Sequence, residues 1–316
     1  MIAEFLGSTS VSAEFTDRWR VPGARAARVW EERFGAHVYV PLADQALSEG
    51  LAQQGVSIDQ VDHFVAAGLH ARSLRSVVGR SGAKREAIAA DLSDTVGNTG
   101  TAHVGLMLAN VLDKAEPGQL IAALLIADGA TAMFFRTTDA IASNRQKASV
   151  EQQIASGRVG LPYAAFLTWR DMLTREPPRR PDPVWPSGPP SYRSEDWKFG
   201  FSGSVCNQCG TVHLPPQRVC VKCQATDDMA LKRMVNVPAT VATFTIDRLA
   251  YSPSPPMVAA VIDFDGGGRL RCELTDVDPN AVEIGQRVEM TFRKLYTADG
   301  IHNYFWKGRL VRNAAE

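Results

Sequence analysis

The chain has 316 residues, of which 45% are hydrophobic and 22% charged, and its 34 basic and 34 acidic side chains cancel to a formal net charge of zero. This composition is ordinary for a soluble globular protein of roughly two domains. A neutral chain has no general attraction for phosphate backbones or anionic membranes, so its charge argues against both as partners. No apolar run approaches the roughly 20 residues of a membrane span, and the N-terminus lacks a signal-like pattern, so we expect a cytoplasmic protein.

The first part of the chain alternates predicted strands and helices. Residues 1–9 have the pattern of a strand, and residues 19–54 that of helical segments interrupted by Pro and Gly, the last one ending near Gly55. A strand is predicted at 61–68 and a helical turn at 73–82. The loop and the helix that follows residue 98 come next, and then an antiparallel pair at 120–129 and 130–138. This alternation predicts an α/β domain.

The middle and the end of the chain have a different sequence pattern from the first part. Residues 161–173 are predicted to form a helix, and residues 176–191 contain seven Pro in sixteen positions, which is typical of a stiff, extended linker. From Val237 onward, short apolar strands separated by Gly, Asp and Pro predict a five-stranded barrel of the oligonucleotide/oligosaccharide-binding (OB) type. The aromatic run at 304–306 is best explained as packing in the last strand of this barrel.

Four of the five cysteines form two CxxC pairs, Cys206 with Cys209 and Cys220 with Cys223, separated by ten residues. Two such pairs on adjacent hairpins can bind one tetrahedral Zn²⁺ and leave no ligand position open for a catalytic water. A structural zinc ribbon is therefore predicted, with a metal-free ribbon and a rubredoxin-like iron site as the alternatives. Cys272 lies in a predicted barrel strand and is expected to pack there as a small apolar residue.

A ribbon beside an OB barrel also occurs in proteins that bind nucleic acid. The region from residue 195 to 316 has fourteen basic and fourteen acidic residues, however, which is a poor balance for a strand-binding groove. We therefore regard nucleic-acid binding as the weakest of three hypotheses for this chain.

Residues 195–316 resemble the DUF35 family, a zinc ribbon fused to an OB fold. The resemblance is carried by the two CxxC pairs, by HLPPQRVC at 213–220, by FDGGGRLRCELTD at 264–276 and by EIGQRVEMTFRKL at 283–295. The family implies acyl-CoA binding and docking to a thiolase-fold partner.

The N-terminal part resembles the C-terminal half of the thiolase superfamily, closest to hydroxymethylglutaryl-CoA synthase and the type III ketoacyl synthases. The matching stretches are residues 13–35, VDHFVAAGLHARSLR at 61–75, VGNTGTAHVGLML at 96–108, and IADGATAMFF at 126–135. A complete thiolase fold has two such halves, of which the first supplies the nucleophilic Cys and the second a His and an Asn. The resemblance thus implies that the nucleophile lies outside this chain.

Within this resemblance, Asn98 corresponds to the active-site Asn, whose amide N–H would hold an enolate or thioester oxygen. The alternative is that Asn98 only serves its GNTG turn. His70 corresponds to the catalytic His if the Leu-Arg at 74–75 sets the alignment; a shifted alignment places Gly68 or Ala66 there and leaves no His. Four basic residues of the barrel are candidates to meet CoA phosphates: Arg269, Arg271, Arg293 and Lys294.

These readings give a predicted order of domains and two leading functions. The order is a thiolase-like half at 1–142, a helix and Pro-rich linker at 143–194, a ribbon at 195–235 and an OB fold at 236–316. The first function is that of an acyl-CoA acyltransferase portion acting with a Cys-bearing half. The second is that of a non-catalytic, acyl-CoA-binding accessory subunit. Either function implies a thiolase-fold partner or a homo-oligomer, because an isolated half leaves apolar surface uncovered.

Overall fold

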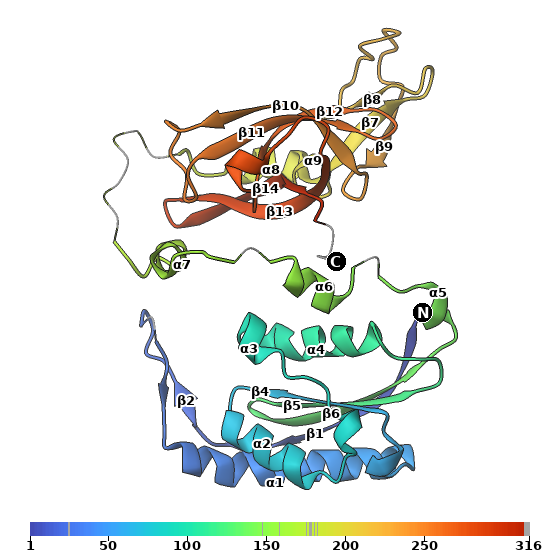
Figure 1. The fold of residues 1–316 in the computed structure, drawn as a ribbon, viewed down its shortest axis with the longest axis vertical. Coiled ribbons are helices and arrows are strands. Elements are labelled where there is room, and N and C mark those ends of the chain that lie inside the picture. The colour runs from blue at the N-terminus through green and yellow to red at the C-terminus, as the bar shows by residue number, and fades with distance from the viewer. Residues whose placement is uncertain are drawn as a thin grey trace. The chain divides into compact units, whose positions relative to one another are not determined.

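The computed structural model describes residues 1–312, apart from Arg25, Lys147, Arg158, Arg175, Pro177, Pro178, Arg180 and Asp182. Its described residues form two compact units that meet in sequence at residue 157 (Figure 1). Each unit is described by itself below. The finer boundaries at residues 142, 194 and 235 stay predictions.

The first unit is built on a four-stranded mixed sheet in the order β1-β6-β5-β4. β4 runs parallel to β5, whereas the β5–β6 and β1–β6 pairs are antiparallel. The sheet contains β1 (Ala3–Ser12), β4 (His63–Gly68), β5 (Leu120–Ile126) and β6 (Gly129–Thr137), and a separate two-stranded hairpin contains β2 (Arg18–Trp19) and β3 (Arg28–Val29). The predicted α/β class and the predicted antiparallel pair are confirmed.

One face of this sheet is covered by α1 (Glu32–Gln54), which packs on β6 and β1, and by α2 (Ala71–Arg80), which packs on β4 and on α1. α1 ends at Gly55, as predicted, and Gly55 adopts the left-handed conformation. The predicted interruption at Pro41 is wrong, because α1 continues through this residue. Tyr39, Val40 and Ala43 bury their side chains against the sheet around Pro41, and this packing outweighs the lost hydrogen bond.

The other face of the sheet carries α4 (His103–Leu112), whose Met107 and Val111 pack on Val65 and Ile121. Strand residues alternate between the two faces, so β5 contributes to both cores. Several short helices and turns complete the unit: η1 (Ile58–Gln60), η2 (Arg85–Ala87), α3 (Ser93–Val96), η3 (Gly100–Ala102), α5 (Ala140–Ser143) and α6 (Val150–Ala155).

The connecting segment contains three short helices, α7 (Tyr163–Trp169), α8 (Gly188–Arg193) and α9 (Glu195–Lys198). α7 lies inside the helix predicted at 161–173. The prediction of an extended linker over residues 176–191 is wrong for its last residues, because α8 begins at Gly188. Four residues of the predicted range lie outside the described residues. Pro189 and Pro190 occupy the first turn of α8, where a missing N–H leaves no intrahelical bond unmade.

The second unit combines a ribbon and a barrel. The ribbon is a three-stranded sheet in the order β8-β7-β9, made of β7 (Ser202–Cys206), β8 (Val212–His213) and β9 (Met229–Arg233). A closed five-stranded barrel follows in the order β10-β11-β12-β14-β13, with β10 (Ala239–Asp247), β11 (Met257–Phe264), β12 (Arg269–Leu274), η4 (Pro279–Ala281), β13 (Arg287–Ala298) and β14 (Ile301–Leu310). The predicted ribbon and OB-type barrel are confirmed.

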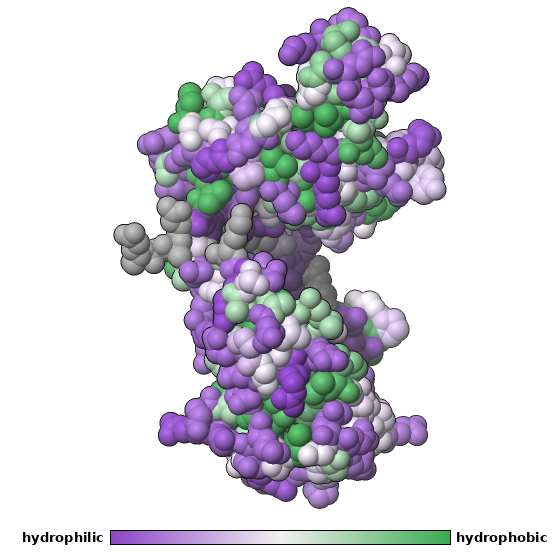
Figure 2. Space-filling view, turned by 90° about the vertical axis from the view of Figure 1, so that its right-hand side faces the viewer, coloured by the Kyte–Doolittle hydropathy of each residue, from purple (hydrophilic) through white to green (hydrophobic). Residues whose placement is uncertain are grey.

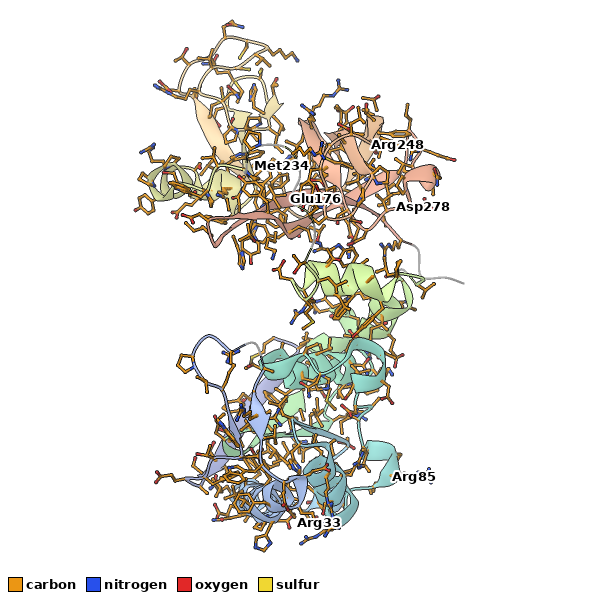
Figure 3. The ribbon with its side chains drawn as sticks, turned by 90° about the vertical axis from the view of Figure 1, so that its left-hand side faces the viewer. Arg33, Arg85, Glu176, Met234, Arg248 and Asp278 are labelled. Carbon is orange, nitrogen blue, oxygen red and sulfur yellow. The ribbon has the colours of Figure 1, made fainter. Side chains whose placement is uncertain are left out.

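Aromatic residues pack at one end of the barrel, where the ribbon joins it. Phe201 is fully buried, and its ring lies 5.5 Å from Trp197 and 5.4 Å from Trp306. Phe305 contacts Trp197 edge-on, so two members of the 304–306 run pack internally as predicted. Met234, labelled in Figure 3, belongs to the same buried cluster.

No helix among the described residues is long and apolar enough to cross a membrane. The face drawn in Figure 2 is predominantly hydrophilic, and its apolar side chains lie in separate groups.

Candidate functional site

The four ribbon cysteines converge on one point. Their Sγ atoms all lie within 4.8 Å of one another, and the Cys206–Cys223 and Cys209–Cys220 sulfurs are 3.5 Å apart. A tetrahedral Zn²⁺ with Zn–S bonds of about 2.3 Å sets sulfurs about 3.8 Å apart, so shifts of a few tenths of an ångström accommodate the ion. The four cysteines therefore support a structural zinc.

The local backbone is shaped for this cluster. Each CxxC closes with a backbone hydrogen bond, from Gly210 N to Cys206 O (2.9 Å) and from Gln224 N to Cys220 O (3.0 Å), and both closing residues have positive φ. The Thr211 hydroxyl and backbone N–H lower the pKa of Cys209 to about 6. At Cys209, thiolate formation, which metal binding requires, is thus favoured, whereas hydrogen bonding with the other three sulfurs raises the pKa of Cys223 to about 12.

Cys272 differs from the ribbon cysteines. It is buried between barrel strands, and burial raises the pKa of its thiol to about 11. A thiol held neutral in this way is neither a nucleophile nor a metal ligand at neutral pH. This agrees with its predicted packing role.

Asn98 lies exposed on the loop between α3 and η3, at the carboxyl end of β4. Its Nδ2 donates to the Gly68 carbonyl (3.0 Å), and its Oδ1 accepts from Gly100 N (2.8 Å). Gly68 has no room for a side chain, since a Cβ there would stand 2.6 Å from the Ile126 carbonyl oxygen. The amide plane of Asn98 is thus fixed by two backbone contacts, with one N–H left to face outward.

His103, a buried side chain at the start of α4, contacts the loop that carries Asn98. It is 2% exposed, its Nε2 lies 3.1 Å from Asp91 Oδ1, and its Nδ1 lies 3.4 Å from the backbone N of Thr99. The residue next to Asn98 is therefore anchored to the first turn of α4. We interpret His103 as a positioning residue for the Asn98 loop.

His70 also lies at the carboxyl end of β4, as the N-cap of α2, and is 6% exposed. Its Nδ1 accepts from Ser73 N (3.1 Å), which leaves the proton of the neutral ring on Nε2. Nε2 is buried without a hydrogen-bond partner among the described residues, as is Oδ1 of Asp17. Both ring nitrogens thus face the interior, and among the described residues no hydrogen bond joins His70 to Asn98.

The surroundings of His70 form a compact polar cluster under α1. A Cβ on Gly35 would lie 2.8 Å from His70 Nε2 and 3.0 Å from Asp17 Oδ1, so this glycine makes room for both. Tyr39 OH donates to Asp17 Oδ2 (3.4 Å), and burial, followed by the Asp17 charge, raises the pKa of Tyr39 to about 12. The cluster joins three elements that are distant in sequence.

Most barrel and ribbon arginines are already neutralised. Arg269 pairs with Asp263 (2.6 Å) and Arg293 with Asp276 (2.8 Å), and further pairs join Arg218 to Asp227, Arg287 to Asp265 and Arg309 to Glu289. Hydrogen bonds from the guanidinium of Arg269 lower the pKa of Asp263. A phosphate would have to compete with these carboxylates.

Arg271 and Lys294 have no ion-pair partner among the described residues. Arg271 borders a shallow hollow of about 290 Å³ on the outer face of β10, β11 and β12. The hollow is also lined by apolar side chains, among them Phe244, Met257 and Val261, and by Thr243, Thr245 and the carboxylate-bearing Asp247. Of the four basic residues predicted to meet CoA, Arg271 alone combines, within the described part of the unit, a charge without an ion-pair partner and an adjoining, partly apolar hollow.

Sequence reasoning missed Asp17 and gave His103 no role. Asp17 stands in a charged, polar stretch that looks like exposed loop, and no periodic pattern marks it as buried. For His103 the available signal was its position five residues after Asn98, at the start of the helix.

Three family models match separate parts of the chain. Residues 51–136 match the C-terminal domain of 3-oxoacyl-[acyl-carrier-protein] synthase III, residues 200–229 the rubredoxin-like zinc ribbon of ChsH2, and residues 235–293 the C-terminal OB-fold domain of ChsH2. The chain joins a thiolase-like domain to a zinc ribbon and an OB fold. Both resemblances inferred from the sequence are thereby confirmed.

Individual relatives cover parts of the chain. A "DUF35 domain-containing scaffold protein" of Methanothermobacter thermautotrophicus is 28% identical over 124 residues, which are 37% of this chain and 91% of that protein. Among solved structures, an "Ltp2-ChsH2(DUF35) aldolase" is 19% identical with a TM-score of 0.31, covering 38% of this chain and 89% of that one. An HMG-CoA synthase in complex with CoA is 18% identical with a TM-score of 0.39, covering 46% and 42%.

Proposed function

We propose that this chain is the acyl-CoA-handling portion of a thiolase-superfamily acyltransferase, akin to hydroxymethylglutaryl-CoA synthase, that makes or breaks carbon–carbon bonds. It acts together with a thiolase-fold half that carries the nucleophilic Cys. That half belongs to another chain or to another part of a longer one.

The cysteine inventory carries this proposal. Four of the five cysteines are committed to the metal cluster, and Cys272 is buried with a raised pKa. None of them offers an accessible thiolate to take up an acyl group. The thiolase-like unit nonetheless carries Asn98 on a loop that is held by hydrogen bonds. It thus has the hydrogen-bond donor of such a site without the nucleophile.

In the proposed reaction, Asn98 donates its outward N–H to the thioester or enolate oxygen. A neutral amide donor carries no charge to desolvate, and its two backbone contacts hold it in place before substrate arrives. His70 remains a candidate acid–base group, but both of its ring nitrogens face the interior. Direct proton transfer by His70 would require its side chain to turn outward when the partner binds.

The substrate is proposed to be an acyl-CoA. Arg271 and the adjoining hollow of β10–β12 offer a cation beside apolar side chains, which suits a phosphate followed by a pantetheine-like arm. Lys294, exposed on β13, is a second free cation. Arg293 contributes only if it exchanges Asp276 for a phosphate.

The proposal is tested by acyl transfer measured as covalent mass. The purified chain is incubated with acetyl-CoA, alone and as the complex isolated from its own source. We expect no acyl adduct on the isolated chain and an adduct on a partner Cys in the complex. An adduct on any of the five cysteines of this chain would contradict the proposal.

A non-catalytic accessory role is the second candidate, and the free Arg271 beside an apolar hollow favours it because acyl-CoA binding by the barrel needs no chemistry from the first unit. The two roles differ in what Asn98 does. Asn98→Ala should lower turnover by the complex about a hundredfold under the first proposal and leave it unchanged under the second.

A further inference from the structure

Residues 18–30, which contain the β2–β3 hairpin, are here named the arm, and the structure describes all of them except Arg25. Its sequence, RWRVPGARAARVW, contains four Arg and two Trp but no Lys, Asp or Glu. Protein interfaces are enriched in aromatic residues and Arg and depleted of Lys and acidic residues. In a chain of zero net charge, the arm therefore concentrates both positive charge and aromatic surface.

Both faces of the arm are exposed. Pairing of Arg18 with Val29 and of Trp19 with Arg28 puts Trp19 and Arg28 on one face and Arg18 and Val29 on the other. The Trp19 and Trp30 rings lie 5.4 Å apart, yet Trp30 remains 58% exposed. Its three described arginines, Arg18, Arg20 and Arg28, form no ion pair with any described residue.

The base of the arm is fixed beside the candidate catalytic residues. Trp30 N donates to the Asp17 carbonyl (3.0 Å), and the Asp17 side chain is buried in the cluster with Tyr39 and His70. The arm thus leaves the unit next to the carboxyl end of β4, where the Asn98 loop also lies. Whatever protein binds the arm is brought to this edge of the sheet.

We infer that the arm docks on the Cys-bearing thiolase-fold subunit, in an apolar hollow rimmed by carboxylates. This inference rests on the proposed function, which requires such a subunit. The unpaired arginines call for acidic groups opposite them, and the exposed indole calls for an apolar pocket. A protein can enclose both faces of the arm, whereas a nucleotide would cover one face and leave the other arginines unpaired.

The test uses the complex of this chain with its Cys-bearing partner, purified as for the acyl-transfer experiment. The arm variants are Arg28→Glu and Trp30→Ala, with Trp30→Phe as a conservative variant. Arg85→Glu is the matched control, because Arg85 is exposed on η2, has no ion-pair partner among the described residues and lies away from the arm (Figure 3). Affinity is measured by sedimentation equilibrium or biolayer interferometry at two salt concentrations.

We expect Trp30→Ala to weaken the complex roughly 30-fold, as for an interface hot spot, and Trp30→Phe much less. Arg28→Glu should weaken it by about tenfold or more, and this loss should shrink as salt rises. Arg85→Glu should change the affinity by less than about threefold. Hydroxyl-radical oxidation of Trp30 should fall when the complex forms.

Each contrary outcome has a separate meaning. If no complex with a Cys-bearing subunit exists, the inference and the proposed function fall together. If the complex forms but the arm variants bind like the parent protein, only the inference fails. If Arg28→Glu spares the complex but abolishes binding of CoA, used as the probe, the arm is a nucleotide site and the inference is overturned.

Discussion

Removal of the metal from the ribbon should unfold the ribbon tip, defined as residues 206–228, and leave the barrel intact. The tip has almost no core of its own: its buried cluster consists of Cys206, Cys220 and Ala225, with Cys209 partly buried, and its other buried apolar residue, Leu214, packs on the barrel cluster. Ordering a residue costs about 1–2 kcal/mol of backbone entropy, which amounts to some tens of kcal/mol for roughly twenty residues. Burying side chains as small as these returns about 1 kcal/mol each.

Metal binding offsets a large part of this cost. Structural zinc in small peptides contributes about 10–16 kcal/mol of apparent binding free energy at neutral pH, and that energy is available only to the folded tip. The barrel needs no such help, because its cluster contains fifteen buried residues, of which Leu214 alone belongs to the tip. Once the metal is removed, the ribbon tip should therefore be much less stable than the barrel.

The assay is hydrogen exchange read by mass spectrometry, before and after treatment with a strong zinc chelator. The amides of Gly210 and Gln224, which close the two CxxC turns, should lose protection, while those of β11 and β12 keep theirs. Cys223→Ser should reproduce the loss and Cys272→Ser should not. A tip that stays protected in protein shown to be metal-free would refute this reasoning and favour a ribbon that folds without metal.

Three further perturbations test the packing and the candidate site. Gly50→Ala puts a Cβ 2.6 Å from the buried Phe134 ring and should lower the free energy of unfolding of the first unit by about 1–2 kcal/mol. The Cβ of Gly79→Ala meets nothing within 4 Å, so this variant should raise the same free energy by up to about 1 kcal/mol. Native-state hydrogen exchange measures both changes. Burial raises the pKa of Cys272 from 9.0 to about 11, so between pH 9 and pH 11 the folded state keeps a thiol proton that the unfolded state has lost. The free energy of unfolding should therefore fall by about 1.4 kcal/mol per pH unit in this range. A Cys272→Ala variant with the same slope would contradict this. Asn98→Ala, assayed in the complex, should lower kcat/KM by about a hundredfold with little change in acyl-CoA affinity, and a fall in affinity alone would show that Asn98 serves binding instead.

Much of the architecture followed from local pattern. The apolar run at 120–129, the glycine at residue 55 and the spacing of the four cysteines are all short-range signals, and each predicted the element that the structure contains. The two helix errors have a common cause. Pro41 and the Pro pair that opens α8 were treated as breakers, yet a proline is tolerated in a first turn, and tertiary packing can override one in a helix interior.

The candidate site was less accessible from sequence. Asn98 was found through a motif, but the carbonyl of Gly68 that holds it is thirty residues away in the chain. The buried pairing of Asp17 with the surroundings of His70 depends on Gly35, a third segment, and no local pattern links the three. The pairing of Arg269 and Arg293 with aspartates likewise emerged only once the barrel strands were in register.

The measurement that tests the central claim most directly is the intact mass of the native assembly, purified from its own source and then separated into its chains. The account predicts that this chain always copurifies with a thiolase-like half that carries a Cys able to accept an acyl group. That half is either a second chain beside a species of 34.3 kDa or part of one longer chain. A 34.3 kDa species that is free of any such half, and that still turns over acyl-CoA, would contradict it.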